Sequence, residues 1–161
     1  MNSLKYLFGT GLYSGLIPKA PGTAGSLAVL LIIAGIIYAQ FYLLLILILI
    51  GSCLISLWVA SYFEEQFGED PGRMVIDEWA GQSLTFIAIS FTGDLKSDFI
   101  ILIAGFILFR FFDILKPLGI NKLQKYKGRA GILGDDLLAG LYALICLKTL
   151  IFTWPKLFGM A

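Results

Sequence analysis

The stretch from Ala20 to Phe63 contains no charged residue, and this feature constrains the fold more than any other. A helix that spans a bilayer needs about 20 apolar residues, each adding about 1.5 Å of rise. The stretch is too long for one such helix, and two antiparallel helices fit it better. We place them at 25–39 and 41–63, with a turn near Gln40. The chain is therefore expected to be an integral membrane protein.

Three further apolar segments predict helices at 79–93, 98–115 and 137–154. Over the whole chain 14% of residues are charged, against about 25% in an average soluble domain. Residues 1–17 are apolar but interrupted by glycines, which is typical of a short interfacial segment. We expect a single all-α domain over residues 1–161. It would be a polytopic membrane helix bundle with about five membrane helices and a short N-terminal interfacial segment.

The charged residues separate by loop if five helices alternate across the bilayer and the N-terminus is cytoplasmic. The polar loops at 18–26, 64–78 and 116–136 then share the inner face. Nine of the 12 basic residues lie on that side, which obeys the positive-inside rule. These nine are Lys5, Lys19, Arg73, Arg110, Lys116, Lys122, Lys125, Lys127 and Arg129. All acidic residues except Asp94 and Asp98 share the same side, so a cytoplasmic functional face is predicted.

The first polar loop reads Pro18-Lys19-Ala20-Pro21-Gly22-Thr23-Ala24-Gly25-Ser26. Its two glycines let backbone N–H groups approach a ligand closely, and the helix N-terminus that follows favours an anion. Lys19 adds a positive charge, and Thr23 and Ser26 add hydroxyl groups. The loop therefore indicates a phosphate-binding site. The structural alternative is a rigid helix entry with Thr23 or Ser26 as the N-cap.

Adjacent carboxylates precede two of the predicted helices. Asp77 and Glu78 stand before the helix at 79–93, and Asp135 and Asp136 follow a glycine-rich stretch that we expect to be a flexible loop. The structural alternative is a complement to the helix dipole, with Asp77 as the N-cap, which explains one carboxylate at such a position well and two less well. Because the pair recurs on the same predicted face, it indicates a functional site.

The helix at 98–115 carries ionisable residues in an aromatic-rich segment. Arg110, Asp113 and Lys116 recur at a spacing of three and so share one helix face. Ionisable residues inside a membrane helix are costly and are usually functional or internally paired. We expect Arg110 and Lys116 to bind phosphate together with Lys19. The structural alternative is an Arg110–Asp113 pair, with Lys116 reaching toward the lipid headgroups.

The remaining inventory narrows the chemistry. The chain contains no histidine, which excludes every histidine-dependent mechanism, and Cys53 and Cys146 lie inside apolar runs where packing is their expected role. No basic patch with interleaved aromatic residues indicates nucleic-acid binding. Carboxylates remain, and hard oxygen ligands combined with substrate phosphate suit Mg²⁺. The expected metal ligands are Asp77, Glu78, Asp135 and Asp136, and the expected catalytic residues are Asp77, Asp113 and Asp136.

Three tryptophans and two aspartates have expected structural roles. Trp58, Trp79 and Trp154 lie near segment ends and are predicted to be interfacial anchors. Asp94 and Asp98 flank a polar turn and are predicted to be turn and cap residues.

Four motifs give the chain a resemblance to the phosphatidylglycerophosphatase A family: GLIPKAPGTAGS, VIDEWAGQ, FRFFDILKP and GILGDDLLAG, spread from residue 15 to residue 140. The resemblance implies a Mg²⁺-dependent enzyme of the bacterial inner membrane. Such an enzyme removes the terminal phosphate of phosphatidylglycerophosphate to give phosphatidylglycerol. The fourth motif departs from the family pattern at Gly134, where a bulkier residue is expected. By motif, the implied functional positions are Lys19, Thr23, Asp77, Glu78, Asp113, Asp135 and Asp136.

Two chemical routes and several other functions fit parts of this pattern. Phosphorus would be attacked either by water activated at the metal or by an aspartate nucleophile. The alternative function is a small ion- or proton-coupled transporter, which predicts acids near mid-membrane and a repeat symmetry. A purely structural subunit does not explain why four polar motifs converge on one side. A CDP-alcohol phosphotransferase would carry a spaced aspartate signature that this sequence lacks.

Overall fold

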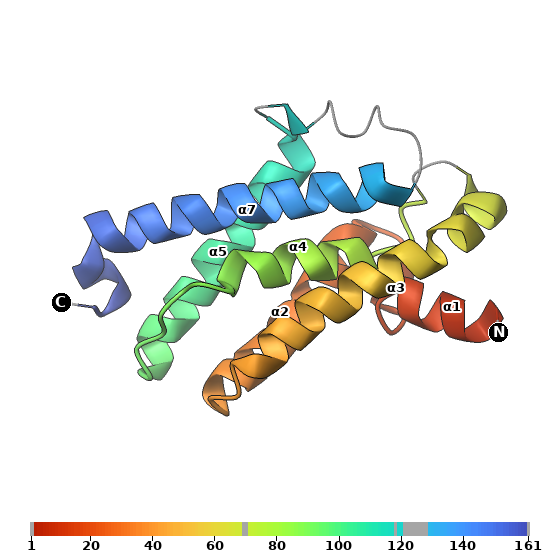
Figure 1. Cartoon of the computed structure of the whole chain (residues 1–161). Coiled ribbons are helices and arrows are strands. Elements are labelled where there is room, and N and C mark those ends of the chain that lie inside the picture. The colour runs from red at the N-terminus through yellow and green to blue at the C-terminus, as the bar shows by residue number, and fades with distance from the viewer. Residues whose placement is uncertain (1, 69–70, 118, 121–128, 161) are drawn as a thin grey trace.

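Helices make up all the regular secondary structure in the part of the chain that the structure describes, which confirms the all-α prediction. The structure is a computed structural model, and it describes residues 2–68, 71–117, 119–120 and 129–160. In chain order the elements are α1 (Asn2–Gly9), η1 (Ser14–Leu16), α2 (Pro21–Tyr38), α3 (Leu43–Phe67), α4 (Ile76–Phe86), α5 (Leu95–Leu115), α7 (Arg129–Thr153) and η2 (Pro155–Phe158) (Figure 1).

Three of these helices are long and apolar enough to cross a membrane: α2, α3 and the Gly131–Thr153 part of α7. They correspond to the helices predicted at 25–39, 41–63 and 137–154. The predicted turn near Gln40 is also confirmed. Gln40 has a φ of 60°, the left-handed conformation that commonly ends a helix.

The helix α4 is shorter than predicted. The segment expected to span the membrane at 79–93 forms a helix of 11 residues that ends at Phe86. Such a helix reaches about 17 Å, whereas the hydrocarbon core of a bilayer is about 30 Å thick. A polar turn follows because the Asp98 carboxylate accepts hydrogen bonds from the backbone N–H groups of Thr92 and Gly93, at 2.7 and 3.1 Å. The expected count of about five membrane helices is thus not confirmed, since three helices among the described residues are long and apolar enough to cross a membrane.

The helix α5 starts where the sequence predicts a cap. The Asp94 side chain accepts a hydrogen bond from the Ser97 N–H at 2.9 Å, and this satisfies one of the free donors in the first turn. The helix continues for 21 residues to Leu115. Its last turns carry Arg110 and Asp113 to the region where α4 begins.

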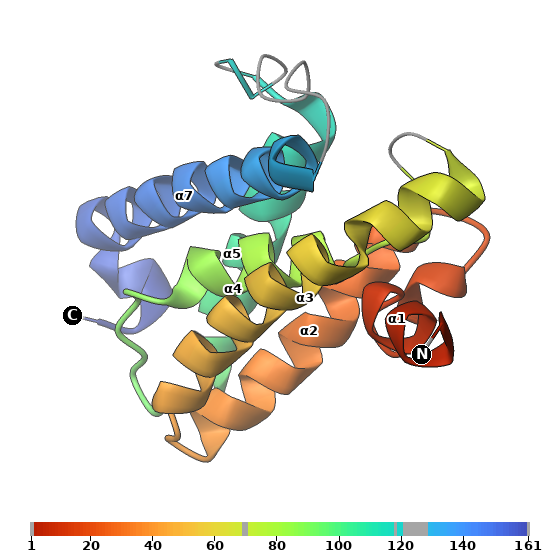
Figure 2. The same cartoon turned by 45° about the vertical axis from the view of Figure 1, so that its right-hand side comes forward.

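The short helix α4 occupies the centre of the bundle. It packs on α7, α3, α2 and α5, while α1 packs on the far part of α3. Figure 1 shows α7 crossing one side of α4, and the turned view in Figure 2 shows α2 and α3 along the other side. The first turn of α4 is therefore enclosed by helices that come from distant parts of the sequence.

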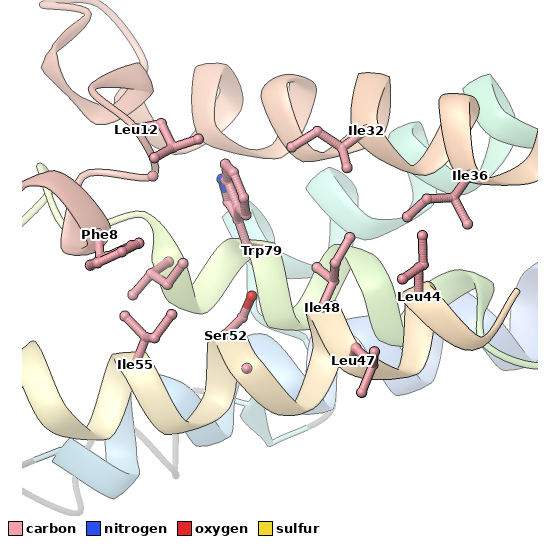
Figure 3. A pocket seen from close by; sticks show the side chains of 13 residues that line it. Phe8, Leu12, Ile32, Ile36, Leu44, Leu47, Ile48, Ser52, Ile55 and Trp79 are labelled. Atoms are coloured by element: carbon pink, nitrogen blue, oxygen red, sulfur yellow. The ribbon is translucent and has the colours of Figure 1, made fainter. Parts of the chain in front are cut away.

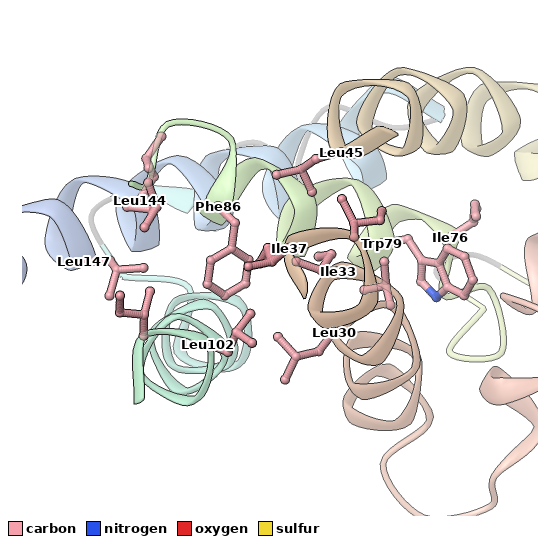
Figure 4. Packing of buried hydrophobic residues seen from close by; sticks show 14 of the residues in the cluster. Leu30, Ile33, Ile37, Leu45, Ile76, Trp79, Phe86, Leu102, Leu144 and Leu147 are labelled. Carbon is pink, nitrogen blue, oxygen red and sulfur yellow. The ribbon is translucent and has the colours of Figure 1, made fainter. Parts of the chain in front are cut away.

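The hydrophobic core lies around α4 and the middle of α2. Figure 4 shows Leu30, Ile33 and Ile37 of α2 facing Phe86 of α4 and Leu102 of α5. The outer faces of the bundle are also apolar, and side chains such as Phe152 of α7 are 86% exposed. Large exposed apolar surfaces mark sites that contact other molecules or lipid, and lipid suits helices of this length.

One of the three tryptophans does not have its predicted role. Trp58 and Trp154 are both exposed, and Trp154 directly follows the end of α7, as an interfacial anchor requires, whereas Trp58 lies within α3. Trp79 is only 8% exposed, so the prediction of an anchor there is wrong. It points inward because α4 lies inside the bundle, where its residues contact other helices on most sides.

Candidate active site

The first turn of α4 carries two carboxylates into the bundle. The N-cap is Val75, whose N–H donates to the Gly9 carbonyl at 2.9 Å, so the alternative of Asp77 as an N-cap is wrong. Asp77 is 4% exposed, and Glu78 is partly buried. An N-terminal first turn favours negative charge, but it does not require two buried carboxylates.

The second carboxylate pair lies inside a helix rather than before one. Because α7 begins at Arg129, the flexible loop expected ahead of Asp135 and Asp136 is wrong for the residues from Arg129 onward. Both Gly131 and Leu133 are buried, so the part of α7 that precedes the predicted helix start at 137 packs into the bundle. Neighbouring residues on a helix point about 100° apart, which separates the two side chains. Asp136 faces α4, and Asp135 faces the end of α5.

Three carboxylates converge where α4 meets α7. Ligand oxygens of Asp77, Glu78 and Asp136 all lie within 4.8 Å of one another, and we call these three residues the acidic cluster. The Oε2 atom of Glu78 is shielded from solvent and has no hydrogen-bond partner. Burial raises the pKa of Asp77 to about 6. Burial and the neighbouring Asp77 carboxylate raise the pKa of Glu78 well above its ordinary value. A cation among these oxygens would offset both effects.

Two glycines bring α4 and α7 close enough for the cluster to form. A Cβ atom on Gly140 would lie 2.9 Å from the carbonyl carbon of Gly81, inside van der Waals contact. A Cβ atom on Gly81 would lie 2.5 Å from the carbonyl oxygen of Asp136. This contact between the two glycines was not predicted from the sequence. Small residues let helix backbones approach closely, and the glycine in each motif is the signal that points to it.

The end of α5 supplies a paired guanidinium group. Arg110 forms an ion pair with Asp113 at 2.5 Å, as the structural alternative predicted, and its Nη1 atom also donates to the Ser26 hydroxyl at 3.3 Å. Ser26 in turn donates to the Gly22 carbonyl at 2.8 Å. Arg110 also lies beside Gly22, since a Cβ atom there would be 3.3 Å from Nη1. The guanidinium group therefore sits next to the first turn of α2.

The first turn of α2 also meets the acidic cluster. A Cβ atom on Gly22 would clash with Oε1 of Glu78, so only glycine allows this contact. The N-cap of α2 is Ala20, which makes no side-chain cap bond, so the alternative that Thr23 or Ser26 is the cap is wrong. Free backbone N–H groups at such a helix start favour an anion. Thr23 is partly buried in this turn.

The two other predicted basic residues have different surroundings. Lys116, the C-cap of α5, forms an ion pair with Asp135, so it does not reach only toward headgroups. Burial tends to lower the pKa of Lys116, but its hydrogen bond to Asp135 and the nearby carboxylates raise it above its ordinary value. Lys19 is exposed in the loop before α2 and forms no ion pair with any residue that the structure describes.

The structure thus brings most of the sequence-predicted residues together. Asp77, Glu78 and Asp136 form the acidic cluster, Arg110 and Ser26 border it through Gly22, and Asp113 binds Arg110. Asp135 is held by Lys116 and lies outside the three-residue cluster. Sequence reasoning did not identify Gln82, whose amide is fully buried and has no partner for either polar atom. Its position one helical turn after Glu78 is the signal that points to it.

Comparisons with known proteins identify the family of the chain. A profile of the phosphatidylglycerophosphatase A family matches residues 7–151. A Bacteroides thetaiotaomicron protein, whose name describes it as an inferred phosphatidylinositol-3-phosphatase, is 41% identical over 88% of this chain and 90% of its own. The phosphatidylglycerophosphatase A of Haemophilus influenzae is 38% identical over 87% and 84%, and that of Escherichia coli is 30% identical over 96% and 88%. No solved structure matches the chain. The chain belongs to the phosphatidylglycerophosphatase A family and is a phosphatase enzyme.

Proposed function

We propose that this chain is a Mg²⁺-dependent lipid phosphatase that hydrolyses the terminal phosphate of phosphatidylglycerophosphate to give phosphatidylglycerol. One observation carries the proposal: the acidic cluster of Asp77, Glu78 and Asp136 lies against the first turn of α2 and beside Arg110. Metal-binding oxygens and phosphate-binding groups therefore face one another. Family membership supports the same reaction, whereas neither observation favours the transporter alternative.

The donor set of the acidic cluster fits Mg²⁺. All three residues offer carboxylate oxygens, which Mg²⁺ prefers, and the distances among them suit a shared cation. The Oε2 atom of Glu78 is buried and has no hydrogen-bond partner, which is costly for a carboxylate oxygen. A bound cation would supply the partner that this oxygen lacks. When bound, Mg²⁺ supplies Lewis acidity that polarises phosphate oxygens and makes water more acidic. We assign Asp135 the role of binding Lys116. It would not contact the metal itself, and its neighbour Asp136 would provide the metal ligand from this pair.

The phosphate group would be held from the opposite side. The backbone N–H groups of Gly22 and Thr23 are available at the start of α2. Because Gly22 has no side chain, a phosphate oxygen can approach them closely. Arg110 is oriented by Asp113 and Ser26, so it offers fixed donors to the same phosphate. Lys116 lies close by, and exposed Lys19 would contribute charge as the headgroup enters.

The reaction would then proceed by displacement at phosphorus. Water attacks phosphorus and a carboxylate of Asp77, Asp113 or Asp136 accepts its proton. The bond between phosphorus and the glycerol oxygen breaks, and the departing oxygen takes up that proton, which restores the carboxylate. Most of the rate acceleration in such reactions comes from positioning and from neutralising charge on the phosphate oxygens. The covalent alternative uses one of these aspartates as the nucleophile and water in a second step. Rapid-quench labelling with radioactive substrate phosphate distinguishes the two, because only the covalent route labels the protein.

Removal of divalent metal is the direct test of the proposal. Purified protein in detergent micelles, given phosphatidylglycerophosphate and Mg²⁺, should release inorganic phosphate. EDTA should reduce that rate by about 100-fold or more, because the charge that stabilises the transition state is lost. Excess Mg²⁺ should restore it. Phosphate release that is unaffected by chelation would contradict the metal assignment, and no release with any metal would contradict the substrate.

A second phospholipid belongs in the same assay. The name of the Bacteroides thetaiotaomicron relative makes phosphatidylinositol 3-phosphate the specific competitor for the substrate assignment. The two lipids share a phosphate monoester and two acyl chains but differ in the alcohol. We expect kcat/KM to be higher for phosphatidylglycerophosphate, and the reverse order would reassign the substrate while leaving the phosphatase chemistry intact.

We further propose that the acidic cluster lies at the cytoplasmic face of a bacterial inner membrane. The distribution of positive charge supports this orientation, although Lys122, Lys125 and Lys127, which contribute to it, lie outside the described residues. Lys19 precedes α2 at the cluster end of the bundle, and Lys96 begins α5 at the opposite end. Both side chains are exposed, so they form a matched pair of labelling positions.

Cysteine labelling in intact cells tests that orientation. In a chain with Cys53 and Cys146 replaced by alanine, we expect K96C to react with a membrane-impermeant maleimide in intact spheroplasts. K19C should react only after the spheroplasts are lysed. The opposite pattern would place the acidic cluster on the outer face.

A further inference from the structure

An apolar groove of about 430 Å³ runs between α2 and α3, with α4 as its floor (Figure 3). Its walls are Ile32 and Ile36 of α2 and Leu44, Leu47 and other residues of α3. This volume lies within the range of about 300–1,000 Å³ that is common for small-ligand sites. The helices α2 and α3 pack mainly on α4 rather than on each other, which leaves the groove between them.

The groove is accessible from the outer surface of the bundle. Ile32, Leu44 and Leu47 are 38%, 44% and 55% exposed although they line it. Both walls are helices that are long and apolar enough to cross a membrane. A groove that opens sideways between two such helices faces the hydrocarbon region of a bilayer, from which an acyl chain can enter without crossing water.

One polar atom in the groove lacks a partner. Trp79 projects into the groove from α4, and its indole Nε1 is buried without a hydrogen-bond acceptor, close to Gly11. An indole N–H is a donor only, and a buried donor normally has a partner. The groove therefore offers one hydrogen-bond donor in otherwise apolar surroundings, which matches an acyl ester with its single carbonyl next to a hydrocarbon chain.

The groove and the acidic cluster are built on the same turns of α4. Ile76 and Trp79 line the groove, and they flank Asp77 and Glu78 in the sequence. On α2, Gly22 contacts Glu78, whereas Ile36 lies 14 residues further along, which corresponds to about 21 Å of helix. The groove thus extends away from the acidic cluster in the direction in which lipid tails extend from a headgroup.

We propose that this groove binds one acyl chain of the substrate lipid, with the indole N–H of Trp79 donating to the ester carbonyl. The proposal rests on the lipid phosphatase function proposed above. It assigns chain-length preference to residues of α2, α3 and Trp79 that lie outside the acidic cluster. The phosphate and the acyl chain would be anchored to one rigid helix, so binding of the tail would help to position the phosphate.

Gly51 allows the groove to be filled without disturbing the packing of the bundle. It lines the groove on α3, and a Cβ atom there would have no heavy atom within 4 Å. The variant G51L therefore places a side chain in open groove space. Gly35 on α2 provides the matched control, because a Cβ atom there also has no heavy atom within 4 Å and Gly35 does not line the groove.

The first arm of the test is kinetic. We compare kcat/KM for a long-chain diacyl substrate with that for a dihexanoyl substrate carrying the same headgroup. G51L should lower the long-chain to short-chain ratio by about tenfold, the loss expected when about two methylene groups are excluded from the groove. G35L should leave the ratio unchanged. W79F should lower kcat/KM for both substrates by about threefold, because both carry the ester carbonyl that would lose its hydrogen bond, and so should also leave the ratio unchanged. An unchanged ratio in G51L would overturn the proposal.

The second arm does not depend on activity. In a W58F/W154F background, Trp79 is the sole tryptophan, and the protein is placed in vesicles of phosphatidylglycerol with brominated acyl chains. Bromine quenches tryptophan only at short range, so fluorescence of buried Trp79 should fall if a chain occupies the groove. G51L should restore most of that fluorescence and G35L should not. Absence of quenching would overturn the groove assignment, whereas quenching without phosphate release would count against the proposed phosphatase substrate alone.

Discussion

Replacing either Asp77 or Asp136 by asparagine is expected to lower kcat for phosphate release by about 1,000-fold or more. Residues that act as one catalytic unit are not additive, so losing one of them costs nearly as much as losing the whole unit. The two side chains come from α4 and α7 and meet in the acidic cluster. Asparagine keeps the shape of the side chain but removes its charge and replaces one oxygen ligand by an amide NH₂ group. Mg²⁺ would then lose one of three carboxylates that the proposed site supplies.

A binding measurement separates loss of metal from loss of fold. In titration calorimetry D77N and D136N should show Mg²⁺ binding that is weaker by about tenfold to a hundredfold. Their circular dichroism and elution volume should match those of the native protein. The matched control is D94N, because Asp94 is the exposed N-cap of α5 and asparagine also serves well as an N-cap. Near-native turnover in D77N and D136N would contradict the site assignment.

The long apolar helices could be predicted because their signal is local. The absence of charge from Ala20 to Phe63 predicts two helices. Gln40, whose backbone has the left-handed conformation, separates them near the expected position. The residues of the acidic cluster could also be predicted, since carboxylates are rare in such a chain and must be paired or bound when they are buried. Composition and charge therefore predicted the carboxylates that the structure brings together.

Features that depend on packing between distant segments could not be predicted. Nothing within 79–93 indicates that α4 stops at Phe86, and the turn at Thr92 and Gly93 that follows is held by Asp98 of the next helix. The extension of α7 back to Arg129 separates Asp135 from Asp136, so one pairs with Lys116 and the other joins the acidic cluster. Trp79 has the sequence context of an interfacial anchor but projects into a groove that exists only in the assembled bundle.

The contact between Gly81 and Gly140 leads to the second large expected effect. Replacing Gly140 by leucine should destabilise the protein by about 3 kcal/mol or more, the upper range for overpacking, because backbone faces backbone and neither can move aside. For a chain of this size that corresponds to a Tm lower by roughly 10 °C. Asp136 belongs to the same stretch of α7, so separating the helices would also disperse the acidic cluster and remove phosphatase activity.

Three variants distinguish this specific contact from a general effect of adding side chains. G140A should have intermediate Tm and activity, because a single methyl group forces a smaller separation of α4 and α7. G35L adds a leucine to α2 at an exposed position with no neighbour within 4 Å, so it should keep the native Tm and phosphate release. Excess Mg²⁺ should raise the Tm of the native protein by binding only the folded state, and it should raise that of G140L much less. A native Tm and native activity in G140L would mean that α4 and α7 do not need this close approach, and the acidic cluster would require another means of assembly.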